Sequence, residues 1–515
     1  MKNDSMFYTE RAMEDLKMKN YSAATADASK AIQLAPKNSA AYLYRGTAYD
    51  ELGQFERALK DYDKAINLGM NNYIVYFNRA GVYSNLERYE RAIPDYNKAI
   101  KLNPHDAVAY LNRGLAYTKL KQYERAIQNY NEAVKLGLKN NELLYINRGL
   151  AYTKLKQYER AISDLDKAVE LNPDSADAYF NRGICYIGLK QYERAIQDFE
   201  KAIEIVPNFD SAYFCRGIVY QELRQYEQAI KDFERVIALN PNDSEAYYNR
   251  GNVYADLNQY EQAIKDFDEA IALNPNDSEA YYNRGNVYAD LNQYEQAIKD
   301  FSKAIELDSE HVAAYNNRGH TYYLLKDFEQ AIPDYDKALE LAPNFFVALL
   351  NRGIAYGTLK QYERAISDLD KAIELNPNSV DAYFNRGACY AELKQYERTI
   401  QDLDKAIEFA PNNALLYNNR GYTFAKLEQY ERAIQDLDKA IELDSKDAYS
   451  YDSRGYVYKK LEQYERAIQD LDKAIELDPN LAEAYFNRGQ CRQALGDAAG
   501  AQADLDKARE SGYND

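Results

Sequence analysis

The chain has 515 residues, of which 82 are Asp or Glu and 64 are Lys or Arg, so its formal net charge is −18. This negative balance argues against nucleic acid as a partner, because phosphate contacts need clustered Lys and Arg. No apolar stretch is long enough to cross a bilayer, the first residues lack the apolar core of a signal peptide, and four cysteines are too few for a disulfide framework. We therefore expect a cytoplasmic protein without a membrane span.

Along the chain, one unit recurs fifteen times on a period of 34 residues, with a single interval of 35. We count positions from the start of each repeat, so that Gly183 is position 8 of the repeat that starts at residue 176. The repeats start at residues 5, 39, 73, 107, 142, 176, 210, 244, 278, 312, 346, 380, 414, 448 and 482. This self-similarity predicts a single continuous array over residues 1–515.

Each repeat predicts two amphipathic helices. In the sixth repeat, Tyr179, Gly183 and Tyr186 are spaced to share one face of a first helix. Residues 192, 195, 196, 199, 202 and 203 share one face of a second helix. Proline at position 32, as in Pro173, ends the second helix because its ring cannot continue the hydrogen-bond ladder. The one extra residue, between 138 and 142, is expected in such a turn.

These positions resemble the tetratricopeptide repeat. The shared pattern is a small residue at position 8, an aromatic at 11, Ala at 20, an aromatic or Leu at 24, Ala at 27 and Pro at 32. Position 4 departs from the family's tryptophan, since it is Tyr in every repeat except one, which has Leu349. The resemblance implies an all-α fold, namely a right-handed superhelical solenoid of antiparallel helix pairs whose first helices line a concave groove. Polar substitutions in the two end repeats predict solvent-facing caps, and hence a monomer.

Position 7 is Arg in every repeat, and position 23 is Asp in all but one, where Asn129 stands. A catalytic site needs one constellation and not fifteen copies of it. We therefore predict that Arg182 and its equivalents pair with acids such as Asp198 in a structural ladder.

The sequence offers no constellation for catalysis or metal binding. Its three histidines, His105, His311 and His320, have no metal-ligand spacing, and no glycine loop could cradle a phosphate. We expect no enzyme activity and no cofactor.

Position 6 is asparagine in eleven repeats. Asparagine is a mediocre helix former, but its amide both donates and accepts, which matches the backbone of an extended peptide. The ladder resembles the one in the superhelical groove of the O-linked N-acetylglucosamine transferase, which implies clamps on a bound peptide. Recent duplication is the alternative, since residues 238–267 and 272–301 are identical. The asparagines predicted to bind a peptide are Asn78, Asn112, Asn147, Asn181, Asn249, Asn283, Asn317, Asn351, Asn385 and Asn419, with Asn487 as a further ladder member.

Most tyrosines occupy the packing positions 4, 11, 17 and 24. Seven others lie on the face of the first helix that points away from the second, where tyrosine favours an interface. These are Tyr44, Tyr248, Tyr282, Tyr323, Tyr422, Tyr449 and Tyr456.

Position 5, beside the asparagines, is predicted to set the preference for a ligand. It is apolar in early repeats and tyrosine in two later ones, where acidic residues surround it, and this stripe is expected to remain unburied. The predicted contacts are Phe77, Leu111, Ile146, Phe180, Phe214, Tyr248 and Tyr282. Lys119 and Lys154 before, and Lys426 and Lys460 after, would give the ligand a charge register.

The sequence thus predicts a protein–protein interaction scaffold that binds an extended peptide or partner segment, apolar with a neutral or basic part. The alternative is an assembly factor that braces a multiprotein complex through its convex face or by end-to-end stacking. The family's chaperone-tail clamp is unlike this chain, because that clamp needs Lys at position 5, which never carries Lys here.

Overall fold

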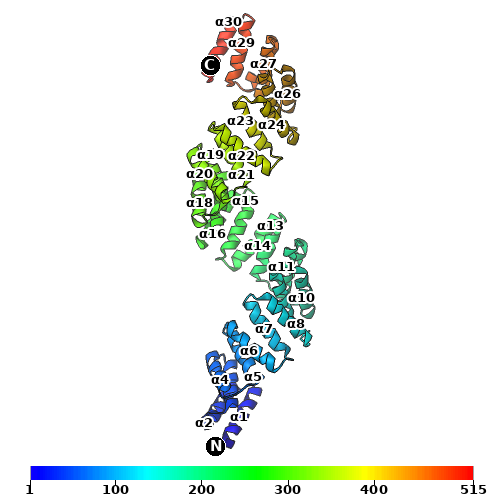
Figure 1. Ribbon diagram of the computed structural model, residues 1–515, viewed down its shortest axis with the longest axis vertical. Coiled ribbons are helices and arrows are strands. Elements are labelled where there is room, and N and C mark those ends of the chain that lie inside the picture. Colours follow the sequence, from blue (N-terminus) through cyan, green and yellow to red (C-terminus); the bar gives the residue numbers. More distant parts are fainter. Residues whose placement is uncertain (1, 514–515) are drawn as a thin grey trace. The chain divides into compact units, whose positions relative to one another are not determined.

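The computed structural model describes residues 2–513 and divides the chain into two compact units, residues 1–257 and 258–515. Over the described residues the secondary structure consists of thirty α-helices without a strand (Figure 1). This confirms the all-α prediction of paired helices. The prediction of one continuous array stays a prediction, and each unit is described by itself.

The helices of the first unit alternate between first and second helices of successive repeats. They are α1 (Lys2–Lys17), α2 (Tyr21–Leu34), α3 (Ser39–Glu51), α4 (Phe55–Asn67), α5 (Tyr73–Asn85), α6 (Tyr89–Leu102), α7 (Ala107–Lys119), α8 (Tyr123–Lys135), α9 (Glu142–Lys154), α10 (Tyr158–Leu171), α11 (Ala176–Gly188), α12 (Tyr192–Ile205), α13 (Asp210–Glu222), α14 (Tyr226–Leu239) and α15 (Ser244–Asp256).

The second unit continues the alternation. Its helices are α16 (Tyr260–Leu273), α17 (Ser278–Asp290), α18 (Tyr294–Leu307), α19 (Val312–Leu324), α20 (Phe328–Leu341), α21 (Phe346–Thr358), α22 (Tyr362–Leu375), α23 (Val380–Glu392), α24 (Tyr396–Phe409), α25 (Ala414–Lys426), α26 (Tyr430–Leu443), α27 (Ala448–Lys460), α28 (Tyr464–Leu477), α29 (Ala482–Ala494) and α30 (Ala498–Glu510).

Close approach of the two helices in a repeat depends on the small residue at position 8. A Cβ added to Gly183 would lie 2.7 Å from Cε1 of Phe199, which is itself fully buried. The alanines at positions 20 and 27, such as Ala195 and Ala202, are also fully buried. Large residues therefore fill the space that small ones leave, as the periodicity predicted.

The turns within and between repeats have recurring features. The turn inside a repeat places position 15 in the left-handed region, and this residue is a lysine in many repeats, such as Lys190 with φ 57°. The extra residue lies between α8 and α9, where Gly137 has φ 102°, so it falls in a turn as predicted. Position 34 caps the next first helix in many repeats, as where the Ser175 hydroxyl accepts from the Ala178 N–H.

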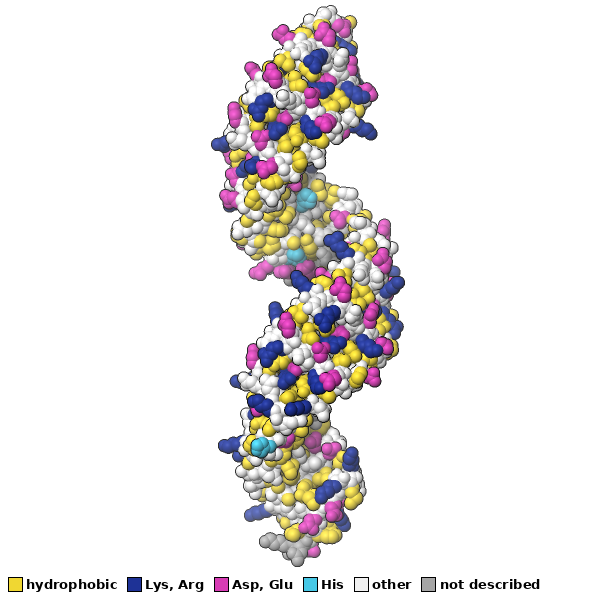
Figure 2. Space-filling view, turned by 90° about the vertical axis from the view of Figure 1, so that its right-hand side faces the viewer, with side chains coloured by type: hydrophobic (Ala, Val, Ile, Leu, Met, Phe, Trp, Pro, Cys, Tyr) yellow, Lys and Arg dark blue, Asp and Glu magenta, His cyan; other side chains and the backbone are white. Residues whose placement is uncertain are grey.

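Charges of both signs are mixed over the surface. Figure 2 shows Lys and Arg interspersed with Asp and Glu on the face in view. In the second helices, lysine at position 26 commonly pairs with glutamate three residues on, as in Lys201 and Glu204 at 2.8 Å. Over the described residues, no helix is both long and apolar enough to span a membrane.

Candidate functional site: the groove face of the first helices

The arginine ladder is confirmed as a structural element and fixes which side of each first helix is left open. In repeat 6, Nε and Nη2 of Arg182 donate to the two carboxylate oxygens of Asp198 at 2.8 and 2.7 Å. The same fork joins position 7 to position 23 through most of both units, and Asp198 is only 5 % exposed. Its repetition and burial assign the ladder to packing.

The ladder has a third hydrogen bond that was not predicted from the sequence. Nη1 of Arg182 donates to Asp166, at position 25 of the preceding repeat, at 2.7 Å. The guanidinium of Arg182, on α11, thus contacts α10 and α12 as well. The hydrogen bond with Asp198 raises the pKa of Arg182. The signal was available, because position 25 carries Asp in many repeats.

The opposite side of the first helices consists of positions 2, 5, 6, 9, 12 and 13, and we call it the groove face. The asparagines of position 6 lie on it, half-buried except for Asn487, which is buried. In several repeats the amide N–H donates to the carbonyl one turn earlier in the same helix, as from Asn181 to Asp177 and from Asn385 to Asp381. The second N–H and the amide oxygen of these side chains are not used in that bond.

Other asparagines bond to neighbouring side chains on the groove face. Nδ2 of Asn78 donates to the Thr47 hydroxyl at 3.2 Å, and that of Asn317 donates to the Tyr282 hydroxyl at 3.1 Å. Asn351 donates to Asn316 at 3.2 Å. These amides hold adjacent first helices together, so the ladder is not uniform along the chain. Asn112, Asn147, Asn249, Asn283 and Asn419 lie at equivalent places on α7, α9, α15, α17 and α25.

The apolar residues of position 5 do not form the unburied stripe that the sequence predicted. Leu111 is 5 % exposed and belongs to the core, which corrects that expectation for this residue. Phe180 is half-buried, with its ring 5.9 Å from that of Phe199 and 4.9 Å from that of Phe209. Position 5 therefore leans toward the second helix. Half-burial also applies to Phe77, Ile146, Phe214, Tyr248 and Tyr282.

Exposed apolar side chains occur instead at position 2, one turn before the asparagine. Ile74, Val108 and Leu143 are 49, 43 and 51 % exposed in three successive repeats of the first unit. In the second unit Leu415 and Tyr449 are 51 and 59 % exposed. The run of large apolar residues at position 2 of three successive repeats was the sequence signal for this surface.

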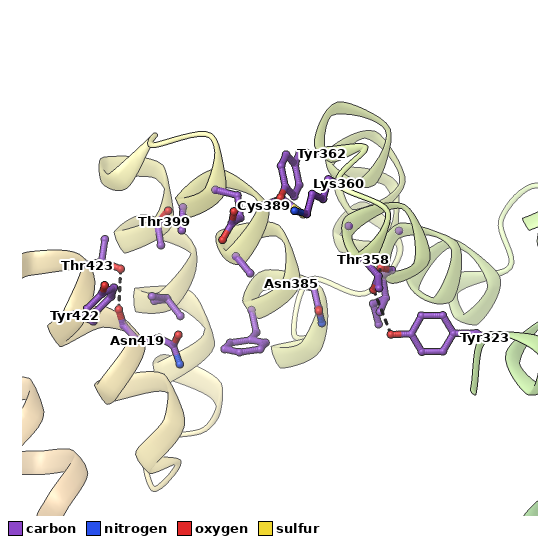
Figure 3. A pocket seen from close by; sticks show the side chains of 18 residues that line it. Tyr323, Thr358, Lys360, Tyr362, Asn385, Cys389, Thr399, Asn419, Tyr422 and Thr423 are labelled. Atoms are coloured by element: carbon purple, nitrogen blue, oxygen red, sulfur yellow. Dashed lines mark hydrogen bonds between the residues drawn. The ribbon is translucent and has the colours of Figure 1, made fainter. Parts of the chain in front are cut away.

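A cavity of about 710 Å³ opens on the groove face of repeats 11 to 13, within the second unit. Asn385 and Asn419 line it from α23 and α25, the first helices of successive repeats, with Tyr422 beside Asn419 and Tyr323 at the opposite end (Figure 3). A small residue contributes to the space, because Ala388 stands at position 9, where most other repeats carry larger side chains.

Thr399, on the second helix α24, contributes to the width of this cavity. It replaces the alanine that every other repeat has at position 20, and its hydroxyl donates to the carbonyl of Gly387 at 3.1 Å. A Cβ added to Gly387 would lie 3.4 Å from its nearest neighbour, against 2.7 Å at Gly183. The two helices of this repeat are therefore more widely spaced, and the cavity reaches Leu403 on α24.

Next to the cavity, lysines and tyrosines gather on α25 and α27. The ammonium of Lys426 lies 4.6 Å from the ring centroid of Tyr422 and 5.1 Å from that of Tyr456. Lys459 and Lys460 approach the Tyr456 ring to 5.1 and 5.5 Å. We call these five residues the lysine–tyrosine cluster. Only part of it was predicted, since Lys459 at position 12 was not singled out.

No group of three or more His, Cys, Asp or Glu side chains arranged to hold a metal ion is found in the described part of the chain. Cys389 lines the cavity, but burial raises the pKa of its thiol to about 11, so it is protonated at neutral pH. The groove face thus offers amides, rings and cations for binding.

Family models for the tetratricopeptide repeat match along the chain. One matches residues 73–106, 107–137, 176–209, 211–243, 278–311, 312–345, 346–379, 380–413 and 414–447, which together make up more than half of the sequence. Two more match residues 149–189, 251–291 and 455–496, and residues 28–60, 233–265 and 437–469. The chain belongs to the tetratricopeptide repeat family, and it is accordingly a scaffold for protein interactions.

Several solved structures are similar to parts or most of the chain, and no curated protein matches it significantly. The crystal structure of YrrB, described as a TPR protein with an unusual peptide-binding site, is 30 % identical, with a TM-score of 0.32, over 36 % of this chain and 95 % of that one. MamA from Desulfovibrio magneticus RS-1 is 26 % identical, with a TM-score of 0.32, over 33 % of this chain and 96 % of its own. The APC/C hetero-tetramer Cut9-Hcn1 is 17 % identical, with a TM-score of 0.40, over 93 % of this chain and 95 % of that one.

Proposed function

We propose that the groove face of repeats 11 to 13 binds an extended peptide segment of a partner protein. The observation that carries this proposal is the cavity of about 710 Å³ lined by both Asn385 and Asn419. The cavity admits a bulky side chain of the ligand, while the amides on either side meet its backbone groups. Each such hydrogen bond contributes about 0.5–1.5 kcal/mol net.

The lining of the cavity supports an apolar anchor. Ile354, Phe384 and Leu403 contribute apolar surface, and Tyr422 adds a 41 % exposed ring at the edge. A side chain that enters here loses contact with water and gains contact with these groups, so burial of apolar area favours binding. A ligand with a leucine- or phenylalanine-like anchor fits this description best.

A displayed library of random peptides, selected on the full chain, supplies the ligands for a test. Binding of the selected peptides is then measured by fluorescence anisotropy with wild type, Asn385→Ala/Asn419→Ala and Ala388→Leu. Ala388→Leu fills the cavity and should weaken binding at least tenfold, and the double asparagine variant should weaken it at least fivefold. Ala272→Leu, an exposed alanine on α16, is the matched control and should change nothing.

Equal binding by wild type and both groove variants would refute this proposal. It would favour the alternative in which the chain braces an assembly through its convex face. Far-UV circular dichroism of each variant verifies that the helices are intact, so that a loss of binding is not a loss of fold.

A further inference from the structure

We propose that the lysine–tyrosine cluster binds the carboxylates of an acidic stretch in the partner peptide. This inference rests on the proposed function, because it places the acidic stretch next to the residue that enters the cavity. Tyr422 belongs to both sites, since it lines the cavity and also contacts Lys426. A single extended segment can therefore contact both in succession.

In the described part of the chain, the lysines of the cluster form no ion pair with a carboxylate, unlike many lysines elsewhere in this unit. The second helices of this unit pair their lysines with glutamates, as in Lys405 with Glu408 at 2.8 Å. In contrast, Lys426, Lys459 and Lys460 have no carboxylate within 4.0 Å among the described residues. Three lysines without an ion pair to a described residue thus lie close together on this face, and an anionic ligand would compensate their charge.

Tyrosine rings give the cations fixed positions. The rings of Tyr422 and Tyr456 lie 5.9 Å apart, centroid to centroid, and Lys426 contacts both. An ammonium held against a ring face keeps its outer N–H groups available for a second partner. The phenol hydroxyls add donors that a carboxylate accepts from.

The third lysine is anchored from the next repeat. Nζ of Lys459 donates to Oδ1 of Asn487 at 2.5 Å and to Oε1 of Gln490 at 2.7 Å, which connects α27 to α29. Nδ2 of Asn487 in turn donates to Asp452 at 3.0 Å. Lys459 therefore provides positive charge at a set position beneath the more exposed Lys426 and Lys460.

Burial lowers the pKa of Lys459 to about 8. Lys460 on the same helix and Lys426 on α25 lower it further, whereas Cys491 on α29 and Asp452 on α27 raise it. A bound carboxylate would favour the protonated ammonium, so binding should be accompanied by proton uptake. Affinity for an acidic ligand should consequently fall as the pH rises through about 8.

This placement changes the expected character of the ligand at this end of the groove face. The sequence predicted a partner with a neutral or basic part, on the strength of acidic residues near Tyr248 and Tyr282. The cluster lies elsewhere, in repeats 13 and 14, and uses positions 9, 12 and 13. It shares no repeat position with the lysine of the family's chaperone-tail clamp.

The test uses the full chain and two fluorescein-labelled peptides, one with a leucine followed by a run of glutamates and one with glutamines in place of the glutamates. Anisotropy at low salt should show at least tenfold tighter binding of the glutamate peptide to wild type. Lys426→Ala/Lys460→Ala should remove that preference. Lys231→Ala/Lys265→Ala, which removes exposed lysines on the second helices α14 and α16, is the charge-matched control and should retain it.

A pH arm separates binding from a structural role. Between pH 7 and pH 9 the preference of wild type for glutamate should fall several-fold, while the circular dichroism spectrum stays unchanged. Inorganic phosphate, added against sodium chloride of equal ionic strength, should compete no better than the chloride. Selective displacement by phosphate would overturn the acidic-peptide assignment in favour of a free anion.

The outcomes distinguish this inference from the proposed function. If Ala388→Leu weakens both peptides but Lys426→Ala/Lys460→Ala weakens neither, the inference is overturned and the proposed function stands. If the two lysine pairs have equal effects, the preference reflects net charge alone and the inference is again overturned. If Ala388→Leu and Asn385→Ala/Asn419→Ala both bind the peptides as tightly as wild type, the proposed function itself is refuted.

Discussion

Repeats 4 and 6 of the first unit place the same arginine in the same packing position but give it different partners. Arg182 forms charged bonds to Asp198 and Asp166, whereas Arg113 donates Nε to the amide oxygen of Asn129 at 2.7 Å and Nη1 to that of Asn97 at 2.6 Å. Burial lowers the pKa of Arg113, while the hydrogen bond with Asp198 raises that of Arg182.

The ladder therefore combines two contributions, the packing of the arginine and the compensation of its charge. Helix packing alone places the guanidinium, because repeat 4, with Asn129 as the partner, has the same helix pair as repeat 6, with Asp198. The carboxylates supply compensation for a charge that packing has already buried. The free energy lost when the arginine is removed should therefore depend on whether its partner is a carboxylate or an amide.

The largest difference between the two repeats is expected when the arginine is removed from each. Arg182→Met leaves Asp198 buried without a cation and should cost about 3 kcal/mol of unfolding free energy. Arg113→Met removes a charge that is hydrogen-bonded to amide oxygens and leaves no carboxylate without its cation, so it should cost under about 1 kcal/mol. Urea unfolding followed by circular dichroism measures both. Equal losses of unfolding free energy, or an unchanged melting temperature for Arg182→Met, would show that pairing with the carboxylate does not stabilise the fold.

Restoring the carboxylate to repeat 4 should strengthen the ladder there. Asn129→Asp should add about 1 kcal/mol, because a charge-assisted fork replaces a single neutral acceptor. The change loses the bond from the Asn129 amide to the Arg125 carbonyl, which is 2.7 Å long. Amide hydrogen exchange of α7 and α8 should slow accordingly. Faster exchange would mean that the lost amide bond matters more than the gained charge.

The turn inside each repeat provides a control, because substitutions there should affect repeats 4 and 6 equally. Lys121 and Lys190 both have φ 57°, a conformation that costs a side chain energy and glycine almost nothing. Lys121→Gly and Lys190→Gly should each stabilise the chain by about 0.5 kcal/mol, since the relief of strain exceeds the entropy that glycine loses. Thermal unfolding of the two variants tests this. Unequal shifts would show that repeats 4 and 6 differ in their turns as well as in their ladders.

The smallest effect is expected at the outer carboxylate. Asp166 is 55 % exposed in its side chain, so water screens its bond to Arg182. Asp166→Ala should cost about 0.3 kcal/mol, and less at high salt. Paired melts at low and high ionic strength give the difference. A loss as large as that of Arg182→Met would place the main compensation at Asp166 and not at Asp198.

The sequence predicted features that most repeats share. Small residues at position 8, proline at position 32 and the pairing of Arg182 with Asp198 all follow from a pattern repeated many times. Local departures were harder to predict. The effect of Thr399 on the cavity depends on how far a helix pair spreads, and the burial of Leu111 depends on side-chain direction within the groove face. The left-handed turn was also hidden, because lysine and glutamate occupy it as readily as asparagine or glycine.

Arg182 bonds both to its own repeat and to the one before it, and this has a consequence for how such chains change length. A repeat inserted in register brings one guanidinium, one inner carboxylate and one outer carboxylate, and each meets its counterpart on either side. Deleting a whole repeat removes the same three groups together. Gene copying in steps of 34 residues therefore leaves no charge stranded, whereas an insertion of any other length within a helix would.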